Sequence, residues 1–98
     1  MITSEQNKLI INYLQPYNPI KIGIFGSVAR GQNTPKSDLD LLVNLAVPLD
    51  LFQFMEIWDD LEELLAMKVD LVTENALKTS NKRVQKNIAN DLILIYEK

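Results

Sequence analysis

The chain has 98 residues, enough for one small domain, and its 47% hydrophobic and 23% charged residues are typical of a soluble globular protein. Its net charge of -3 argues against a general nucleic-acid binder, because phosphate backbones bind basic surfaces. Cysteine and histidine are absent, so disulfides and thiolate or imidazole metal ligands are excluded. Any metal site must use oxygen ligands, which suits Mg²⁺ or Mn²⁺.

Neither a membrane span nor a secretory signal is expected. No apolar run approaches the roughly 20 residues that a membrane span needs. The first five residues lack a basic region followed by an apolar core. A cytoplasmic location is therefore the expectation.

Helices and strands are predicted to alternate along the chain. In order they are a helix over 3–14, a strand over 20–25, a short helix over 28–31, a strand over 38–45, a helix over 50–65, a strand over 68–72, a helix over 76–90 and a strand over 92–96. Thr3 or Ser4 caps the first helix, Gln6 is placed for a capping box, and the polar stretch 32–36 is a loop. No repeat or linker interrupts the pattern, so residues 1–98 are expected to form a single α/β (α+β) domain with helices packed on one sheet.

The helix over 50–65 carries more apolar residues than one sheet contact needs. Asp50 is its predicted N-cap. Apolar residues recur at helical spacing at Leu51, Phe54, Met55, Trp58, Leu61 and Leu65. Phe52 and Ile57 widen this stripe, which favours a wide buried face. The alternative is that the spare apolar surface forms an interface with another molecule.

Three aspartates lie in the second and third predicted strands. Asp38 and Asp40 are two residues apart, so on a strand they point to the same face. Asp70 lies within an apolar strand, where acids are rare unless paired or metal-bound. Because close carboxylates repel unless a cation lies between them, the three predict an all-oxygen site for one or two divalent metals. The alternatives are a turn or cap role for Asp38, a salt bridge to a lysine for Asp40 and an ion pair with Lys68 for Asp70.

A turn beside these acids has the parts of an anion site. Gly26 and Ser27 follow a strand and precede a short helix, which leaves free backbone amides at one place. Gly26 lets a phosphate approach the backbone, and the Ser27 hydroxyl can add a hydrogen bond. Arg30 either contacts phosphate or orients an aspartate through a bidentate pair, and we favour the second use. Gly31 would end the short helix.

The spacing of these residues resembles that of a known family. Gly26-Ser27-x-x-Arg30-Gly31, then Ser37-Asp38-x-Asp40, then Asp70 on a later strand, are similar to the motif of the nucleotidyltransferase superfamily of the DNA polymerase β type. The chain resembles most closely the minimal nucleotidyltransferases, or MNT domains, which have about this length. The similarity extends over nearly the full chain, and no motif position departs from the pattern.

The resemblance implies a nucleotidyltransferase fold, with a mixed β-sheet of about four strands and flanking helices. It implies that Asp38, Asp40 and Asp70 are the catalytic residues and hold Mg²⁺, as two ions. Gly26, Ser27 and Arg30 would bind the triphosphate of ATP or another nucleoside triphosphate. An acceptor hydroxyl would attack the α-phosphorus and pyrophosphate would leave, with the metals activating the acceptor and steadying the leaving oxygens. Asp70 is the candidate to take the acceptor proton, because no histidine is available.

The resemblance also implies a partner. Minimal proteins of this kind resemble the antitoxin of HEPN/MNT toxin–antitoxin pairs, in which the partner is a helical HEPN ribonuclease and some members transfer AMP to its tyrosine. The expected acceptor is therefore a partner protein, whereas nucleic acid and membranes are not expected ligands. Two alternatives stay open: an antitoxin that acts by complex formation alone, and a nucleotidyltransferase subunit that modifies a small molecule. A homo-oligomer is also left open.

Overall fold

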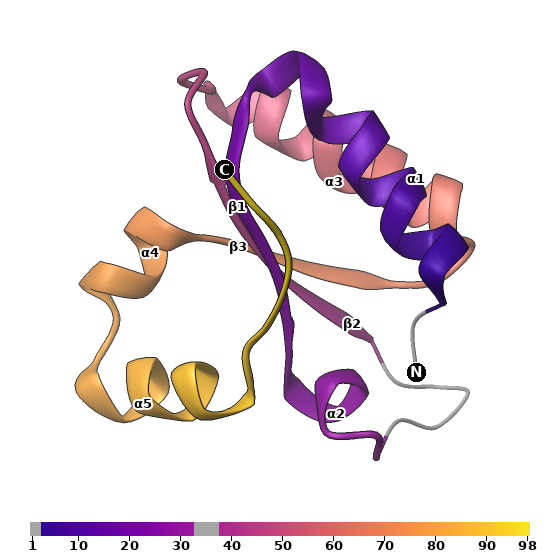
Figure 1. Cartoon of the computed structure of the whole chain (residues 1–98). Helices are drawn as coiled ribbons and strands as arrows, with labels where there is room; N and C mark the ends of the chain where they lie inside the picture. The colour runs from indigo at the N-terminus through magenta and orange to yellow at the C-terminus, as the bar shows by residue number, and fades with distance from the viewer. Residues whose placement is uncertain (1–2, 33–37) are drawn as a thin grey trace.

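The computed structural model describes residues 3–32 and 38–98 (Figure 1). Ser37 of the predicted motif and residues 33–36 of the predicted loop lie outside the described residues. The elements follow in the order α1 (Ser4–Leu14), η1 (Gln15–Tyr17), β1 (Pro19–Phe25), α2 (Gly26–Ala29), β2 (Leu39–Leu45), α3 (Leu51–Leu65), β3 (Val69–Thr73), α4 (Glu74–Thr79), α5 (Lys82–Asp91) and β4 (Ile93–Glu97). The short 3₁₀ helix η1 connects α1 to the first strand.

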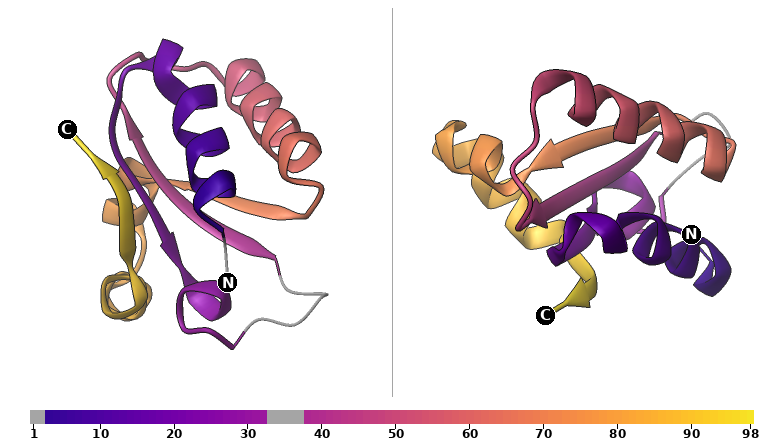
Figure 2. Two further views of the ribbon diagram at one scale, coloured as in Figure 1. Left: turned by 45° about the vertical axis from the view of Figure 1, so that its right-hand side comes forward. Right: turned by 90° about the horizontal axis from the view of Figure 1, so that it is seen from above.

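The four strands form one mixed sheet in the order β3-β2-β1-β4. β1 is antiparallel to both β2 and β4, whereas β2 and β3 are parallel and are connected through α3. Figures 1 and 2 show α1 and α3 on one side of the sheet, α4 and α5 on the other, and α2 at the end of β1. The predicted mixed sheet with flanking helices is confirmed.

Apolar side chains cover both faces of the sheet. The larger cluster packs α1 and α3 against the strands and includes Ile24 and Leu41. The smaller cluster lies on the α4 and α5 side and includes Leu42 and Ile88. Because side chains alternate along a strand, Asp40 shares the α5 side with Leu42. The carboxylates of the candidate site therefore lie on the face with the smaller apolar cluster.

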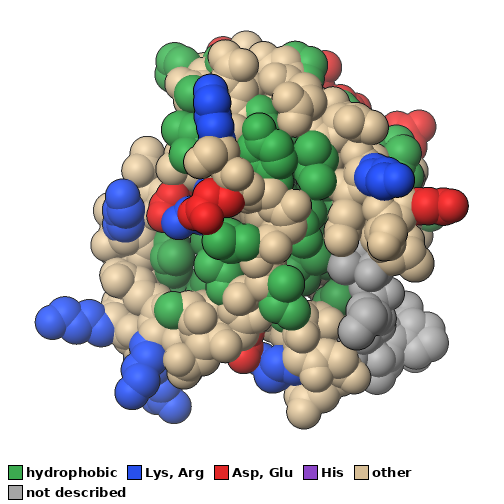
Figure 3. All heavy atoms as spheres, viewed as in Figure 1, with side chains coloured by type: hydrophobic (Ala, Val, Ile, Leu, Met, Phe, Trp, Pro, Cys, Tyr) green, Lys and Arg blue, Asp and Glu red, His purple; other side chains and the backbone are tan. Residues whose placement is uncertain are grey.

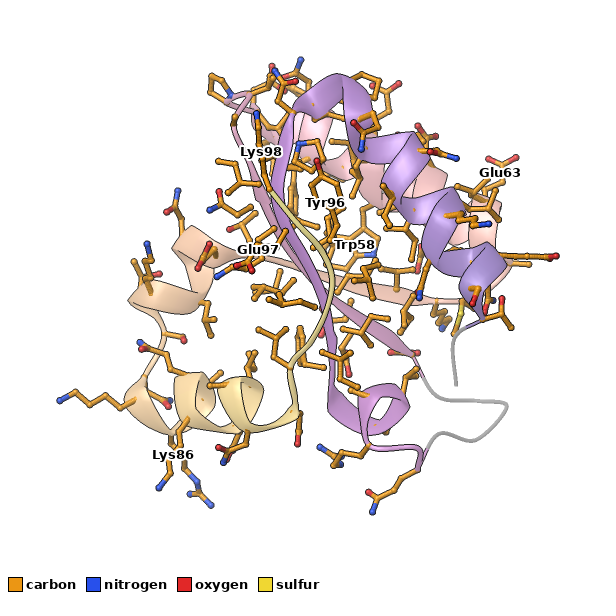
Figure 4. All side chains as sticks on the ribbon, in the orientation of Figure 1. Trp58, Glu63, Lys86, Tyr96, Glu97 and Lys98 are labelled. Carbon is orange, nitrogen blue, oxygen red and sulfur yellow. The ribbon has the colours of Figure 1, made fainter. Side chains whose placement is uncertain are left out.

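Side-chain hydrogen bonds fix where the helices begin and how they attach to the sheet. Thr3 and Gln6 form the predicted capping box of α1, and Asp50 forms a second one at the start of α3. Trp58 points into the interior (Figure 4), where its Nε1 donates to the carbonyl oxygen of Val69 at 2.6 Å. This bond joins α3 to the strand that carries Asp70.

Two helices differ from the prediction. The short helix begins at Gly26, directly after the strand, and not at Val28. The predicted helix over 76–90 is two helices, because the chain is extended at Ser80 and Asn81. The Asn81 carboxamide oxygen accepts a backbone amide of α5 and caps that helix. Serine and asparagine bond to nearby backbone and favour caps over helix interiors, which explains the break.

The wide buried stripe predicted for α3 is wrong in its first half. Leu51, Phe52 and Met55 are 68%, 83% and 53% exposed. The buried residues of the helix are Ile57, Leu61 and Leu65. A helix packed on one sheet buries a stripe of about 100°, and the apolar residues of the first two turns extend around more of the circumference than that. The alternative interpretation, a spare apolar surface, describes this end of the helix correctly.

The rest of the surface has separate apolar and basic regions. Figure 3 shows hydrophobic side chains on the face occupied by β4, and Lys and Arg side chains gathered over α5. Ile93 and Leu94 are 51% and 42% exposed, because β4 is an edge strand with one unpaired side. Among the described residues, no helix has the length and apolarity to cross a membrane.

Candidate active site

The turn after β1 brings Gly26 against a carboxylate of the neighbouring strand. Gly26 has a φ of +74°, in the left-handed region that favours glycine. The strand register places Phe25 opposite Asp40. A Cβ atom on Gly26 would lie 2.0 Å from Oδ2 of Asp40. Gly26 is therefore required twice, for its backbone conformation and for the close approach of the Asp40 carboxylate, a contact that the sequence did not predict.

Asp40 and Asp70 are register partners on the parallel strands β2 and β3. Side chains in register on neighbouring strands share one face and start about 4.8 Å apart. Asp40 is half-buried, whereas Asp70 is exposed, because β3 is an edge strand. Asp38 is also exposed and lies one residue before β2, so the predicted strand over 38–45 begins one residue too early and Asp38 is outside the observed strand. The topology thus brings the carboxylates of Asp40 and Asp70 side by side, and it leaves Asp38 just before the first residue of β2.

The electrostatics of Asp40 show that the other charges are near. Burial raises the pKa of the Asp40 carboxyl, and the negative charges of Asp70 and Asp38 raise it further. The charge of Arg30 acts in the opposite direction and lowers it. A divalent cation would relieve this repulsion, and carboxylate oxygens are the ligands that Mg²⁺ prefers. The donor set of this face therefore fits a magnesium site.

The three carboxylates do not yet converge on one point. Within residues 3–32 and 38–98, no group of three or more acidic side chains has the spacing that would hold a metal ion. The salt bridges suggested as alternatives are also not formed in this part of the chain, where the two ion pairs are Lys21–Glu74 and Arg30–Asp91. The assignment of Asp38, Asp40 and Asp70 as joint ligands stays a prediction.

Arg30 binds an aspartate, but not one of the three. Its guanidinium contacts the carboxylate of Asp91 at the end of α5, and its Nε donates to Oε1 of Gln32 at 3.2 Å. The interpretation that Arg30 orients one of the site's aspartates is corrected in this respect. The ion pair connects the C-terminal end of α2, the helix that begins at Gly26, to α5, which covers the face of the sheet that carries Asp40. Asp91 is 61 residues away in the sequence, and no local pattern could have paired it with Arg30.

A groove opens beside the carboxylates on the α4 and α5 side. It has a volume of about 310 Å³, and its lining includes Phe25, Asp70, Val72, Leu77 and Ile88. Apolar walls with a polar group at the edge are typical of small-molecule sites. The groove is thus placed where a ligand could lie along the sheet with its charged end near Asp70.

The fold and the site together define a nucleotidyltransferase. The chain belongs to the polymerase beta nucleotidyltransferase family, whose model matches residues 8–98. It is 43% identical over 81 residues to a Methanocaldococcus jannaschii protein with a proposed protein adenylyltransferase activity, covering 83% of this chain and 81% of that one. It is 35% identical over 75 residues to the protein adenylyltransferase MntA of Thermococcus cleftensis, covering 76% of this chain and 73% of that protein.

Solved structures share the same fold. A chain from a toxin–antitoxin crystal structure with AMP-PNP superposes with a TM-score of 0.77 at 24% identity, covering 94% of this chain and 73% of that chain. A chain from the complex of the tri-AMPylated Shewanella oneidensis HEPN toxin with MNT antitoxin superposes with a TM-score of 0.73 at 20% identity, covering 99% of this chain and 74% of that chain. At these identities the likeness shows the fold.

Proposed function

We propose that this protein transfers AMP from ATP to a hydroxyl group of a partner protein in a magnesium-dependent reaction. The partner would be a HEPN-type ribonuclease toxin, and the protein its antitoxin. The observation that carries the proposal is the Asp40 carboxylate, which lies against Gly26 and in register with Asp70. The similarity to protein adenylyltransferases supports the reaction, and the likeness to toxin–antitoxin complexes supports the partner.

The chain's own residues would bind the triphosphate on one side of the reacting α-phosphate and take the proton of the acceptor hydroxyl on the other. Backbone amides of the Gly26 turn and the Ser27 hydroxyl would bind the triphosphate, with the positive charge of Arg30 nearby. The acceptor oxygen forms a bond to the α-phosphorus while the bond to the bridging oxygen breaks, and pyrophosphate leaves. Asp70 is exposed and would take the proton of the acceptor hydroxyl.

Asp38, Asp40 and Asp70 would hold magnesium, for which two ions are expected in this family. Bound Mg²⁺ supplies charge that favours ionisation of the acceptor hydroxyl and stabilises the leaving oxygens. The half-buried position of Asp40 would orient its carboxylate by contact with the Gly26 backbone, whereas Asp38 and Asp70 would contribute from the exposed rim. ATP is the proposed nucleotide, and a cytoplasmic location stays a prediction.

A second candidate function is neutralisation of the toxin by complex formation alone. The observation that favours it is the exposed apolar surface at the start of α3, formed by Leu51, Phe52 and Met55. Exposed apolar patches are typical of protein–protein interfaces. Under this proposal the carboxylates would not be needed for protection from the toxin.

The test uses the purified chain, ATP labelled on the α-phosphate, Mg²⁺ and the HEPN-type protein that we expect the adjacent gene to encode. We expect label on a hydroxyl of the partner, and we expect Asp38→Ala with Asp40→Ala to reduce the transfer to background. Lys86→Ala on α5, whose side chain points away from the sheet (Figure 4), is the control that should transfer normally. The absence of transfer by the unaltered chain, together with full toxin neutralisation by the double variant, would establish the second candidate instead.

A further inference from the structure

The start of α3 presents a contiguous apolar surface to solvent. Leu51, Phe52 and Met55 are separated by one, three and four positions, so on a helix their side chains are neighbours. Phe52 is 83% exposed, more than the other large hydrophobic residues of the described chain. We call these three residues the α3 patch. No residue of the described chain buries it, although each of its members is a residue type that proteins usually place inside.

The α3 patch borders an open groove. The groove has a volume of about 550 Å³ and lies where β2 and β3 end, between the start of α3 and the start of α4. Its apolar wall includes Val47, Pro48, Leu49 and Phe54. Leu51 belongs to both the patch and the groove lining, so the two form one continuous surface with a flat part and a hollow part.

The charge around this surface has one sign. The stretch 50–66 contains six acidic residues and no Lys or Arg: Asp50, Glu56, Asp59, Asp60, Glu62 and Glu63. Asp60 and Glu62 are engaged inside the chain, with the Tyr13 hydroxyl and the Val69 amide. Glu56 and Asp59 are exposed, and in the described part of the chain neither forms an ion pair. The apolar surface therefore has an acidic border.

This charge distribution selects the kind of molecule that could cover the surface. A symmetric dimer through the α3 patch would place the acidic border of one copy against that of the other. Nucleic acid and anionic lipid would be repelled in the same way. A cluster of the chain's own basic residues, Lys82, Arg83 and Lys86, lies on α5, across the sheet from α3 (Figures 1 and 3). A contact in which α5 of one copy covers the α3 patch of the next would be head-to-tail. Such a contact forms a ring or an open filament, and not a two-fold dimer.

We propose that the α3 patch and its groove dock a partner protein through an apolar segment that is flanked by Lys or Arg side chains. An apolar side chain of the partner fills the groove, the patch covers the rest of its apolar face, and the basic side chains pair with Glu56 and Asp59. The surface lies at the ends of β2 and β3, whereas the candidate active site lies at their beginnings. Docking and catalysis are therefore carried by separate regions of the chain. This inference rests on the proposed function only in taking the HEPN-type protein as the partner.

The experiment measures the affinity between the chain and the HEPN-type protein that we expect the adjacent gene to encode, by titration calorimetry at two salt concentrations. Phe52→Lys and Met55→Lys each remove apolar contact and add the wrong charge, so each should weaken binding at least 30-fold, as expected for a residue at the centre of an interface. Higher salt should weaken binding by the unaltered chain, and less so when Glu56→Lys has removed part of the border. All substituted residues are exposed, so the melting temperature should stay within a few degrees.

Ile93→Lys is the matched control, because Ile93 is 51% exposed and Met55 is 53% exposed. It puts the same substitution on the edge strand β4, so unchanged binding is expected. Weakening by Ile93→Lys with no effect of Phe52→Lys would overturn the proposal and place the partner on the sheet edge. Self-association of the chain that Phe52→Lys abolishes, with unchanged binding to the partner, would also overturn it.

The outcomes separate this inference from the proposed function. Asp40→Asn should bind the partner as the unaltered chain does, because Asp40 lies at the other end of the strands. A complex that forms and is lost on Phe52→Lys, with no AMP transferred, would support the docking surface and refute the adenylyl transfer. AMP transfer to the partner that is undiminished by Phe52→Lys, with unchanged affinity, would support the transfer and refute the docking surface.

Discussion

Replacing Gly26 by alanine tests whether the contact with Asp40 matters for the reaction, and Gly31 provides the control. Both glycines have a left-handed backbone, with φ values of +74° and +72°. An L-residue in this region costs about 1–2 kcal/mol. Gly26→Ala and Gly31→Ala should therefore lower the free energy of unfolding by similar amounts, and the melting temperature by about 4–16 °C in a domain of this size.

The two substitutions differ in what the new methyl group meets. At Gly31 it meets nothing within 4 Å, whereas at Gly26 it would lie 2.0 Å from Oδ2 of Asp40, and real Cβ atoms essentially never approach closer than 3.0 Å. The carboxylate can rotate away at little cost in folding energy, but it must move by about 1 Å, and misplacement of this size in an active site costs on the order of 100-fold in rate. Gly26→Ala should thus lose about 100-fold in AMP transfer, and Gly31→Ala should lose little.

The assay compares initial rates of AMP transfer at a temperature where thermal unfolding shows both variants to be folded. Mn²⁺ binding to each variant, measured in the same buffer, reports on the carboxylates without the reaction, and it should weaken for Gly26→Ala alone. Equal losses of transfer in the two variants would mean that backbone strain, and not the position of Asp40, explains the need for glycine. Full transfer by Gly26→Ala would refute the reasoning altogether.

Three further substitutions test the stability of the fold. Burial raises the pKa of Asp40, so the folded state holds this proton more tightly than the unfolded state, and stability falls as the pH rises from about 3.9 through the folded pKa. Asp40→Asn should therefore be more stable than the unaltered chain at pH 7 in a urea titration, with no difference below about pH 4. Tyr13→Phe removes a hydroxyl that donates to Oδ2 of Asp60 at 2.5 Å, and should cost about 1–2 kcal/mol at an unchanged urea slope; no loss would mean that water replaces the bond. Asn81→Ala removes the cap of α5 and should cost about 1 kcal/mol, whereas Asn90→Ala, exposed on the same helix, should cost far less in the same titration.

Local chemistry explains what the sequence predicted correctly. The capping box of Thr3 and Gln6 and the cap at Asp50 need only neighbouring residues, and both are present. The strand with Leu39 and Leu41 needed only apolar residues at period two. The approach of Asp40 to Asp70 followed from placing acids on two neighbouring strands, Asp38 and Asp40 on one and Asp70 on the other. These features depend on a few adjacent positions, so a single sequence is sufficient to find them.

The features that the sequence did not predict depend on residues far apart or on what covers a surface. The Arg30–Asp91 pair joins residues 61 positions apart, and its partner choice depends on where α5 lies. Asp70 is exposed because its strand is at the edge of the sheet. The apolar pattern of a strand does not indicate whether that strand is at an edge or in the centre. Phe52 has the residue type of a core position, but whether it is buried depends on the width of the sheet beneath α3.

The separation of the two functional regions limits the geometry of the partner. Asp40 and Leu45 are five residues apart on β2, which corresponds to ~17 Å along a strand. A partner docked on the α3 patch must therefore present its acceptor hydroxyl about 17 Å from the docked segment, along the length of the strands. The acceptor could lie at the end of a helix that reaches this far, or on an extended tail. The tail would need at least about 5–6 residues, since each extended residue covers about 3.3 Å. Shortening such a tail should abolish AMP transfer while leaving the affinity unchanged, because the tail contributes to the reaction and the docking surface holds the partner.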